Sequence, residues 1–271
     1  MTTTRPVALV TGASSGIGKA ASLALAEAGF DVIGTSRDAS RVTPLDGVTY
    51  LDLDVASDES VTSAVQQVIG RFGRIDVLVN NAGVGSTGAA EERSVAQDQR
   101  VFNVNVFGTM RMTKAVLPHM RAQGRGRVIN ISSIFGFIPA PYMAVYAASK
   151  HAIEGYSESL DHEVREHGVR ALLVEPANTQ TAFDVNAEHP ETSLQVYADQ
   201  RQTFDRLMAA LIKDGDDPAT VARVIVAAAT DPKPRLRYTA GAQAGRVSAL
   251  RCIVPARSFD KQIRKINQLA G

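Results

Sequence analysis

The sequence predicts one α/β domain of the Rossmann type, a doubly wound parallel sheet with helices on both faces. Its 271 residues are 45% hydrophobic and 21% charged, which suits one large globular domain. Short apolar runs alternate with helical segments from the N-terminus onward. A glycine-rich turn at residues 11–18 joins the first run to the first helix. Such alternation indicates βαβ crossovers, and hence a parallel sheet covered on both faces.

Each element is predicted from its own pattern. Apolar runs bounded by turn residues predict strands over residues 7–10, 31–35, 76–79, 127–131 and 169–174. Apolar positions at helical spacing predict helices over residues 19–28, 58–72, 95–120, 146–167 and 218–229. Gly29 and Gly73 end the first two helices, and Ser57 caps the second.

We expect residues 1–271 to form a single dinucleotide-binding and catalytic domain with two appendages. Residues 182–217 follow a strand end and contain an amphipathic stretch from 194 to 212. Because ligands bind outside the carboxyl ends of the strands in open α/β sheets, this segment is a candidate substrate lid. Residues 232–271 form a basic C-terminal extension.

The charge of the chain is nearly balanced but unevenly distributed. The net charge is +1, which gives no general reason to expect a nucleic-acid partner. The C-terminal extension carries +8 and the remainder −7. One interpretation is docking on an acidic membrane surface or partner through Leu250, Ile253, Val254 and Phe259. The other, which we favour, is packing of the extension on its own domain.

Composition also bounds the compartment and the chemistry. The single cysteine, Cys252, excludes an internal disulfide. The short polar N-terminus leaves no room for a signal peptide, and no run of about 18 apolar residues predicts a membrane span. We therefore expect a cytoplasmic protein. His162 and His167 point about 140° apart on a helix and cannot share one ion, so we expect no metal.

The glycine-rich turn has the features of a phosphate-binding loop. Gly12 permits the tight turn, Gly16 lets the backbone approach a phosphate, and Gly18 allows close packing of helix on strand. The free N–H groups and positive dipole at the start of the next helix favour a pyrophosphate. Ser14 and Ser15 add hydroxyl donors, so the turn predicts a dinucleotide site.

The end of the second strand predicts which dinucleotide binds. An acidic residue there would hold the ribose 2′-hydroxyl of NAD, but this chain has Ser36 and Arg37. The Arg37 guanidinium can form charge-assisted hydrogen bonds to a 2′-phosphate, and Ser36 can donate another. Asp38 follows one residue later. The sequence therefore favours NADP over NAD.

Tyr146 and Lys150 lie four residues apart, on one face of a predicted helix. A free tyrosine has a pKa near 10, too high for a base at neutral pH, and a neighbouring ammonium lowers that pKa. A tyrosine tuned in this way can give or take a proton on a substrate oxygen. Ser133 ends a strand and can bond a developing oxyanion, although its neighbour Ser132 is an alternative.

Together these residues resemble the short-chain dehydrogenases/reductases in their shorter form. The likeness covers roughly residues 6–181 and rests on five motifs in the family's order and spacing. They are TGASSGIG at 11–18, NNAG at 80–83, Asn105 in NVNVFG, Ser133, and YAASK at 146–150.

The resemblance implies a role for each catalytic residue. Tyr146 would be the acid/base, and Lys150 would lower its pKa and hold the nicotinamide ribose. Ser133 would position the substrate carbonyl, and Asn105 would hold a water in a proton relay. The residues predicted or implied to bind the cofactor are Gly12, Ser14, Ser15, Gly16, Ile17, Gly18, Ser36, Arg37, Asp54, Val55, Asn81, Ala82, Gly83, Tyr146, Lys150, Pro176, Asn178 and Thr181.

One position departs from the family pattern. The family has Pro-Gly where this chain has Pro176-Ala177, which bears on the local backbone shape. The resemblance also implies a homodimer or homotetramer through the helices over residues 95–120 and 146–167. A lipophilic substrate of the steroid, retinoid or ketoacyl kind is favoured by apolar residues near the site, namely Phe135, Phe137, Ile138, Met143 and Phe183.

Two other functions stay open. A dinucleotide-binding regulator without chemistry would not need Tyr146, Lys150, Ser133 or Asn105. A sugar-nucleotide epimerase or dehydratase of the related extended form would need a larger C-terminal domain than 271 residues provide. The sequence therefore favours an NADP-dependent oxidoreductase acting on the CH–OH group of a small-molecule substrate.

Overall fold

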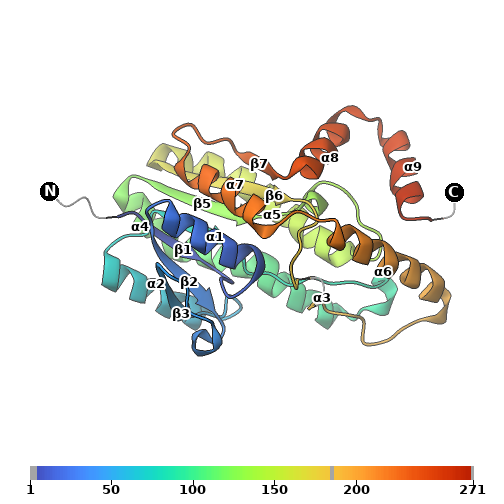
Figure 1. The fold of residues 1–271 in the computed structure, drawn as a ribbon, viewed down its shortest axis with the longest axis horizontal. Coiled ribbons are helices and arrows are strands. Elements are labelled where there is room, and N and C mark those ends of the chain that lie inside the picture. The colour runs from blue at the N-terminus through green and yellow to red at the C-terminus, as the bar shows by residue number, and fades with distance from the viewer. Residues whose placement is uncertain (1–4, 184–185, 270–271) are drawn as a thin grey trace.

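The computed structural model describes residues 5–183 and 186–269, which form a parallel sheet between two layers of helices (Figure 1). The sheet order is β3-β2-β1-β4-β5-β6-β7. Every pair of neighbouring strands among these runs parallel. The strands are β1 (Val7–Val10), β2 (Asp31–Ser36), β3 (Val48–Asp52), β4 (Val77–Asn80), β5 (Gly126–Ile131), β6 (Val169–Pro176) and β7 (Arg237–Ala240).

The helices begin and end largely where local chemistry requires. Ser57 caps α2 by accepting a hydrogen bond from the Ser60 backbone N–H, and Gly73 closes that helix with a φ of 69°. The helices are α1 (Gly16–Glu27), α2 (Asp58–Phe72), α3 (Val95–Phe102), α4 (Thr109–Gln123), α5 (Ala144–Val164), α6 (Ala198–Lys213), α7 (Pro218–Thr230), α8 (Ala242–Ile253) and α9 (Ala256–Ile266).

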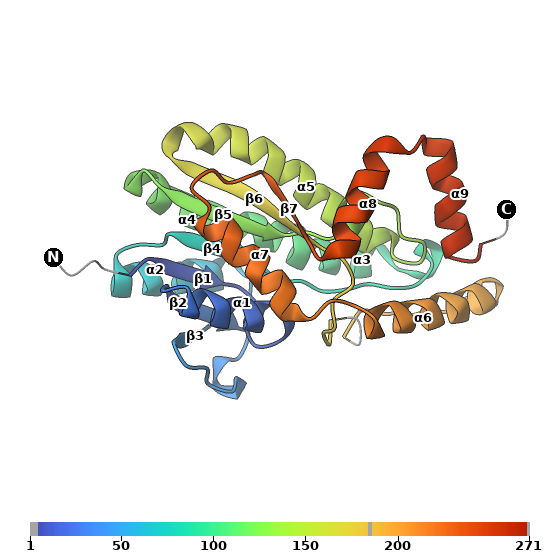
Figure 2. The same ribbon diagram turned by 45° about the horizontal axis from the view of Figure 1, so that its top comes forward.

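Two apolar cores sandwich the sheet. Helices α2, α4 and α5 cover one face, and α1 and α7 cover the other (Figure 2). Leu78 of β4 packs in the first core with Met112, and its neighbour Val79 packs in the second with Ile225. Successive residues of a strand thus face opposite helix layers, which is why the strands consist of continuous apolar runs.

The predicted fold class is confirmed, while two predicted helices change. Helix α1 begins at Gly16, inside the glycine-rich turn, rather than at residue 19. The helix predicted over 95–120 is interrupted by a π-helical turn, η3 (Asn103–Gly108), before it continues to Gln123. At this turn the Thr109 hydroxyl donates to the backbone carbonyl of Asn105 at 3.0 Å.

The edge strands β3 and β7 were not predicted. Strand β3 is only half-buried and ends in the exposed Asp52. Strand β7 has four residues, of which Arg237 and Thr239 are partly exposed. Short strands with polar side chains at a sheet edge lack the continuous apolar run that marked the central strands.

Helix α6 of the lid candidate and helices α8 and α9 of the C-terminal extension lie at the end of the molecule opposite the N-terminus (Figures 1 and 2). Helix α6 accounts for most of the predicted amphipathic stretch. In the extension, Ala244 is fully buried, and Val247 and Phe259 pack beside η4 (Ile134–Gly136). The extension therefore packs on its own domain, as we favoured, along one side. In the described part of the chain, no helix has the length and apolar character to cross a bilayer.

Candidate active site

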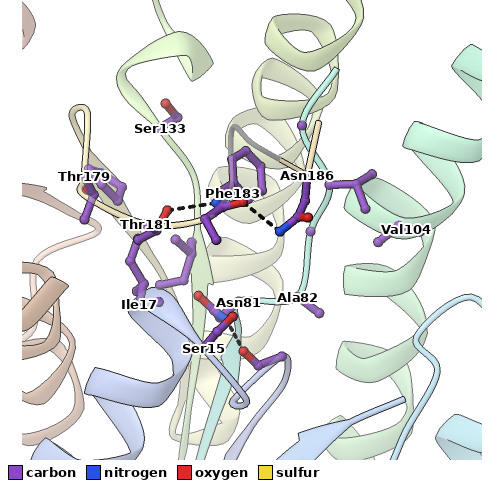
Figure 3. Close-up of a pocket in the computed structure, with 18 of the residues that line it drawn as sticks. Ser15, Ile17, Asn81, Ala82, Val104, Ser133, Thr179, Thr181, Phe183 and Asn186 are labelled. Carbon is purple, nitrogen blue, oxygen red and sulfur yellow. Dashed lines mark hydrogen bonds between the residues drawn. The ribbon is translucent and has the colours of Figure 1, made fainter. Parts of the chain in front are cut away.

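A cleft of about 770 Å³ opens at the carboxyl ends of the parallel strands (Figure 3). Residues after four strands line it, represented by Gly12 after β1, Asn81 after β4, Ser133 after β5 and Ala177 after β6. This is where open parallel sheets bind ligands. Of the predicted site residues, all but Gly18 and Asn105 line this cleft.

The glycine-rich turn forms one wall of the cleft and depends on its glycines. Gly12 and Gly16 have φ angles of 65° and 53°, in the left-handed region that favours glycine. A Cβ on Gly18 would lie 2.3 Å from the Gly12 carbonyl oxygen and 2.4 Å from Asn81 Nδ2. Ser15 is the N-cap of α1, yet its hydroxyl makes no capping hydrogen bond. That hydroxyl and the first N–H groups of α1 are therefore available to an anion.

Asn81 locks this turn to the neighbouring strand end. Its Nδ2 donates to the backbone carbonyls of Thr11 at 2.9 Å and Gly12 at 3.0 Å. The Thr11 hydroxyl in turn accepts from the backbone N–H groups of Asn81 and Ala82. Asn81, Ala82 and Gly83 line the cleft as predicted, but the Asn81 amide donor is engaged by the turn itself.

The end of β2 presents a cation while its nearest carboxylate is already paired. Ser36 and the exposed Arg37 line the cleft. Asp38 accepts from the Ser40 backbone N–H at 3.1 Å and pairs with Arg41 at 2.9 Å. Within residues 5–183 and 186–269 no ion pair involves Arg37. Arg37 is therefore the cation at this edge that can meet a phosphate.

Asp54 and Val55 line the cleft beyond β3. Asp54 Oδ1 accepts from the Ala56 backbone N–H at 2.9 Å, and the Asp54 backbone N–H donates to Ser60 Oγ at 2.9 Å. The first bond orients the Asp54 carboxylate, and the second fixes the backbone of Asp54 to the start of α2.

Tyr146 and Lys150 reach the cleft from the first turns of α5. Lys150 Nζ lies 5.6 Å from the centroid of the Tyr146 ring and donates to the Ile131 carbonyl at 2.8 Å. Burial lowers the pKa of Lys150 to about 8, and the negative charge of Glu154 opposes that fall. The Tyr146 ring is buried and packs against Phe183, with centroids 5.7 Å apart.

The two candidate serines have different surroundings. Ser133 Oγ accepts from the Phe135 backbone N–H at 3.2 Å, so its own hydrogen can still be donated to a substrate oxygen. Ser132 Oγ lies beside Glu154, and a Cβ on Gly136 would be 2.6 Å from it. Both serines line the cleft, but Ser133 has the hydroxyl that is better placed for a ligand.

Asn105 is buried and braces the site from behind. Its Nδ2 donates to the Val84 carbonyl at 2.9 Å and to Ser149 Oγ at 3.2 Å, and its Oδ1 accepts from the Val84 N–H at 2.8 Å. The side chain thus ties η3 to the segment after β4 and to α5. Its implied role in holding a water stays a prediction.

Comparisons with known proteins agree with this geometry. The family model described as short chain dehydrogenase matches residues 6–192. This chain belongs to the short-chain dehydrogenase family. The dehydrogenase is 40% identical over 237 residues to the 3-ketodihydrosphingosine reductase of Bacteroides thetaiotaomicron, with 87% of each chain covered.

Two solved structures resemble this dehydrogenase along most of its length. A short-chain dehydrogenase from Streptomyces avermitilis matches with a TM-score of 0.80 and 34% identity, covering 96% of this chain and 98% of that one. A metagenomic short-chain oxidoreductase in complex with NADP matches with a TM-score of 0.67 and 28% identity, covering 86% of this chain and 96% of that one. Both support an oxidoreductase of the Rossmann type.

The dehydrogenase accommodates alanine where the family has glycine after β6. Among the described residues, the non-glycine positive φ angles are those of Tyr142 and Gln268, so Ala177 adopts a conformation open to any residue. Its carbonyl accepts from the Thr179 hydroxyl at 3.1 Å. Thr181 Oγ1 accepts from the Phe183 N–H at 3.2 Å (Figure 3). The backbone at this position therefore does not require glycine.

The predicted apolar wall of the dehydrogenase is partly confirmed. Phe135, Met143 and Phe183 line the cleft. Phe137 and Ile138 instead pack with α8 in a separate apolar cluster, because the η4 turn directs them away from the cleft. Sequence reasoning missed Met208 of α6, which also lines the cleft, although the amphipathic pattern of that stretch could have indicated it.

A buried ionic cluster behind Lys150 was also missed. Glu154 of α5 and Glu175 of β6 both pair with Arg237 of β7, the latter at 2.5 Å. Burial raises the pKa of Glu154 to about 7, while the bonds from Ser132 and Arg237 oppose the rise. Glu154 lies four residues after Lys150 on the same helix face, a spacing that could have flagged it.

Buried Glu92 fastens the lid candidate to the segment before α3. Its carboxylate accepts from the Leu194 N–H at 2.7 Å and the Ala89 N–H at 3.1 Å, and it pairs with Arg201 of α6. Burial alone would raise the pKa of Glu92, but these three partners outweigh burial and lower it. The fully buried Glu92 carboxylate is thus one anchor of the helix that carries Met208, and buried Phe204 of the same helix is another.

Proposed function

We propose that this dehydrogenase transfers hydride between NADP and a lipophilic ketone or secondary alcohol. The observation that carries the proposal is the convergence of Tyr146, Lys150 and Ser133 on the same cleft as the glycine-rich turn and Arg37. A cleft with a phosphate-binding wall and a proton-transferring wall suits a redox reaction at a carbonyl carbon.

The residues present fit a phosphorylated dinucleotide. The backbone of the turn occupies the space where a Cβ on Gly18 would lie, so the turn packs directly on α1. The first N–H groups of α1 then face the cleft and can bind a phosphate. Arg37 and Ser36 suit a 2′-phosphate, because Asp38 is neutralised by Arg41. We assign the remaining contacts to Ser14, Ser15, Ile17, Asp54, Val55, Asn81, Ala82, Gly83, Lys150, Pro176, Asn178 and Thr181.

The chain supplies the proton chemistry. When bound, the nicotinamide ring supplies or accepts the hydride. Tyr146 gives a proton to the substrate oxygen in reduction and takes it back in oxidation. The Lys150 ammonium, held by the Ile131 carbonyl at 2.8 Å, favours the tyrosinate. Ser133 donates to the substrate oxygen and fixes its position, and Asn105 holds the water that connects Lys150 to solvent.

The substrate class follows from the apolar part of the cleft lining. Phe135, Met143, Phe183 and Met208 line the cleft beside Tyr146, and an apolar wall favours a substrate without charge near the carbonyl. The Bacteroides relative is named for the reduction of 3-ketodihydrosphingosine. We propose a keto compound or secondary alcohol with an extended apolar group for this chain.

Segment 182–217 is proposed to close over that substrate as a lid of the single domain. We further propose assembly as a homodimer or homotetramer through the helices over residues 95–120 and 146–167, that is, α3 with α4 and α5. Phe107, half-exposed beside α4, supports this assembly because a large apolar side chain gains from burial against a second copy.

The proposal is tested by replacing one hydroxyl. In Tyr146→Phe, turnover of a lipophilic ketone should fall by about 10²- to 10⁴-fold, the usual contribution of acid–base catalysis. NADPH affinity, measured by calorimetry, should stay the same. Absorbance of the reduced nicotinamide, followed with NADPH and with NADH across a panel of ketones, reports both substrate class and cofactor choice.

Tyr142→Phe provides the control, since Tyr142 packs against Phe204 rather than lining the cleft. That variant should keep its turnover. Equal turnover in both variants would contradict the acid–base assignment, and binding of NADPH without turnover of any carbonyl by the unaltered protein would favour a regulator.

A further inference from the structure

The C-terminal end of α8 exposes two large apolar side chains beside the turn into α9. Leu250 is 55% exposed and Ile253 is 79% exposed. They lie three residues apart and therefore on one face of α8. Single exposed apolar residues are common on protein surfaces, but an adjacent pair at the tip of a projecting helical hairpin indicates an interaction surface.

Basic side chains surround this pair. Arg246 on α8 and Arg257, at the start of α9, are exposed, as are Lys261 and Lys265 farther along α9. The latter three recur every four residues and so form one outward ridge of α9. Phe259 lies on the opposite side of the helix and packs toward η4. We call Leu250, Ile253 and these four cations the basic tip.

One cation of the hairpin has a different task. Arg251 stacks on the Phe259 ring, 5.0 Å from its centroid, and donates to the Phe137 carbonyl at 3.2 Å. These contacts join α8 to α9 and to the segment after η4, so the position of the basic tip relative to the rest of the domain is fixed.

We propose that the basic tip docks this protein on an anionic phospholipid surface. Lipid headgroups attract the ridge of cations, and the acyl boundary takes up Leu250 and Ile253. Charge argues against pairing with the same hairpin of a second copy, because residues 242–269 hold six Lys or Arg against one Asp and two such hairpins would repel each other. Nucleic acid would satisfy the cations but would leave the two apolar side chains in water.

The location of the basic tip gives docking a consequence for the cleft. Ala244 and Val247 of α8 pack in one apolar cluster with Ile134, the residue that follows Ser133. Helix α6, which contributes Met208 to the cleft, lies at the same end of the molecule (Figures 1 and 2). Docking would therefore bring the substrate side of the cleft toward the lipid rather than away from it.

Vesicle flotation with the full chain tests this proposal without any substrate. The protein should float with vesicles of phosphatidylcholine mixed with phosphatidylglycerol and stay behind with phosphatidylcholine alone. High salt should release it, because screening weakens exposed charges. NADPH affinity, measured in parallel, reports the proposed function separately and should not depend on the vesicles.

Two variants locate the surface. R257Q/K261Q/K265Q should lower the partition coefficient by about a hundredfold, as expected for three surface cations, and L250S/I253S should lower it by at least about tenfold. Matched controls remove the same number of charged or apolar side chains elsewhere: R71Q/K114Q/R223Q and V95S/V196S alter exposed residues of other elements and should float like the unaltered protein.

Four results would overturn the proposal. The first is no flotation with phosphatidylglycerol at low salt. The second is equal loss in the control triple variant, which would place binding elsewhere. The third is a change of mass in solution for L250S/I253S without any change in flotation, which would assign the tip to contact between copies. Binding of a DNA duplex in place of vesicles would likewise reject a lipid partner.

Discussion

The two walls of the cleft are built in different ways. The dinucleotide wall consists of backbone held by short-range locks, such as the left-handed Gly12 and the Asn81 amide that bonds two of its carbonyls. The substrate wall consists of side chains from two places: Phe135 and Met143 lie before or at the start of α5, whereas Phe183 and Met208 belong to the segment that Glu92 anchors from far away in the sequence. The first wall is held by bonds between neighbouring strand ends, whereas part of the second is held by contacts between distant segments, among which the Glu92 carboxylate is fully buried, so each wall can be perturbed without the other.

Glu92→Ala is expected to have the largest effect and to act on the substrate wall alone. It leaves two backbone N–H groups and Arg201 without their shared acceptor, and loss of such a buried partner costs about 3 kcal/mol. Limited proteolysis should then cleave within residues 186–217 faster, and KM for a lipophilic ketone should rise while NADPH affinity stays constant. Glu91→Ala, which removes only a surface bond to Tyr197, should change neither.

The same anchor has a predictable pH dependence. The pKa of Glu92 is lowered in the folded protein, so its stabilisation is present above the pKa of an unfolded glutamate, about 4.3. It is lost as pH falls through the lower folded pKa. Proteolysis of the segment by an acid-active protease should therefore accelerate on acidification in the unaltered protein and stay flat in Glu92→Ala.

Gly18→Ala should damage the dinucleotide wall instead. The added methyl would lie 2.3 Å from the Gly12 carbonyl oxygen, and such overpacking costs about 2 kcal/mol. NADPH affinity should fall at least about tenfold, with a matching loss in the free energy of unfolding measured in urea. Gly70→Ala is the control, because nothing lies within 4 Å of its Cβ position. In α2 that change should stabilise the protein by up to about 1 kcal/mol. Equal affinity in both variants would contradict the role of Gly18.

Glu154→Gln tests the proton-transferring residues between the two walls, because Glu154 lies one helical turn beyond Lys150 and acts on its charge. Because the pKa of Glu154 is about 7, its carboxylate is ionised above that pH. Its negative charge then stabilises the ammonium form of Lys150, whose pKa is about 8. Removing that charge should move the alkaline limb of the kcat–pH profile to lower pH by about one pH unit.

If Glu154 had only a structural role, Glu154→Gln would lower kcat by the same factor at all pH values. Glu158→Gln is the matched control. It also removes a partner of Arg237, but its side chain is 47% exposed, so the profile should keep its limbs.

Ala177→Gly should have the smallest effect. Since Ala177 already has an unstrained backbone, restoring the family's glycine adds only flexibility. NADPH affinity and the free energy of unfolding should each change by less than about 1 kcal/mol. A large gain in affinity would mean that the alanine distorts the dinucleotide wall.

The difference between the walls explains how far the sequence alone could go. The glycine turn, Tyr146, Lys150 and Ser133 follow local spacing rules, so the fold class and most of the cleft were predicted. The bond from Leu194 to Glu92 joins residues 102 apart, and the pair between Arg237 and Glu154 joins residues 83 apart. No local pattern records such partners. The predicted helix over residues 95–120 was also interrupted in the structure, because hydrogen bonds to distant residues shape the chain there. The Asn105 amide makes such bonds and holds the π-helical turn in place.

Arg237 of β7, the last strand of the sheet, pairs with two buried carboxylates behind the active site. It is the counterion that lets Glu154 and Glu175 share one buried space, and it follows the last of the five sequence motifs by more than 80 residues. A chain cut before β7 would keep all four proposed catalytic side chains, yet it would leave two acids facing each other in a dry interior behind Lys150. In such a fragment, either water would enter around Glu154 and Glu175 or one of the two carboxylates would be protonated. Arg237 therefore helps to position α5, although β7 lies outside the cleft.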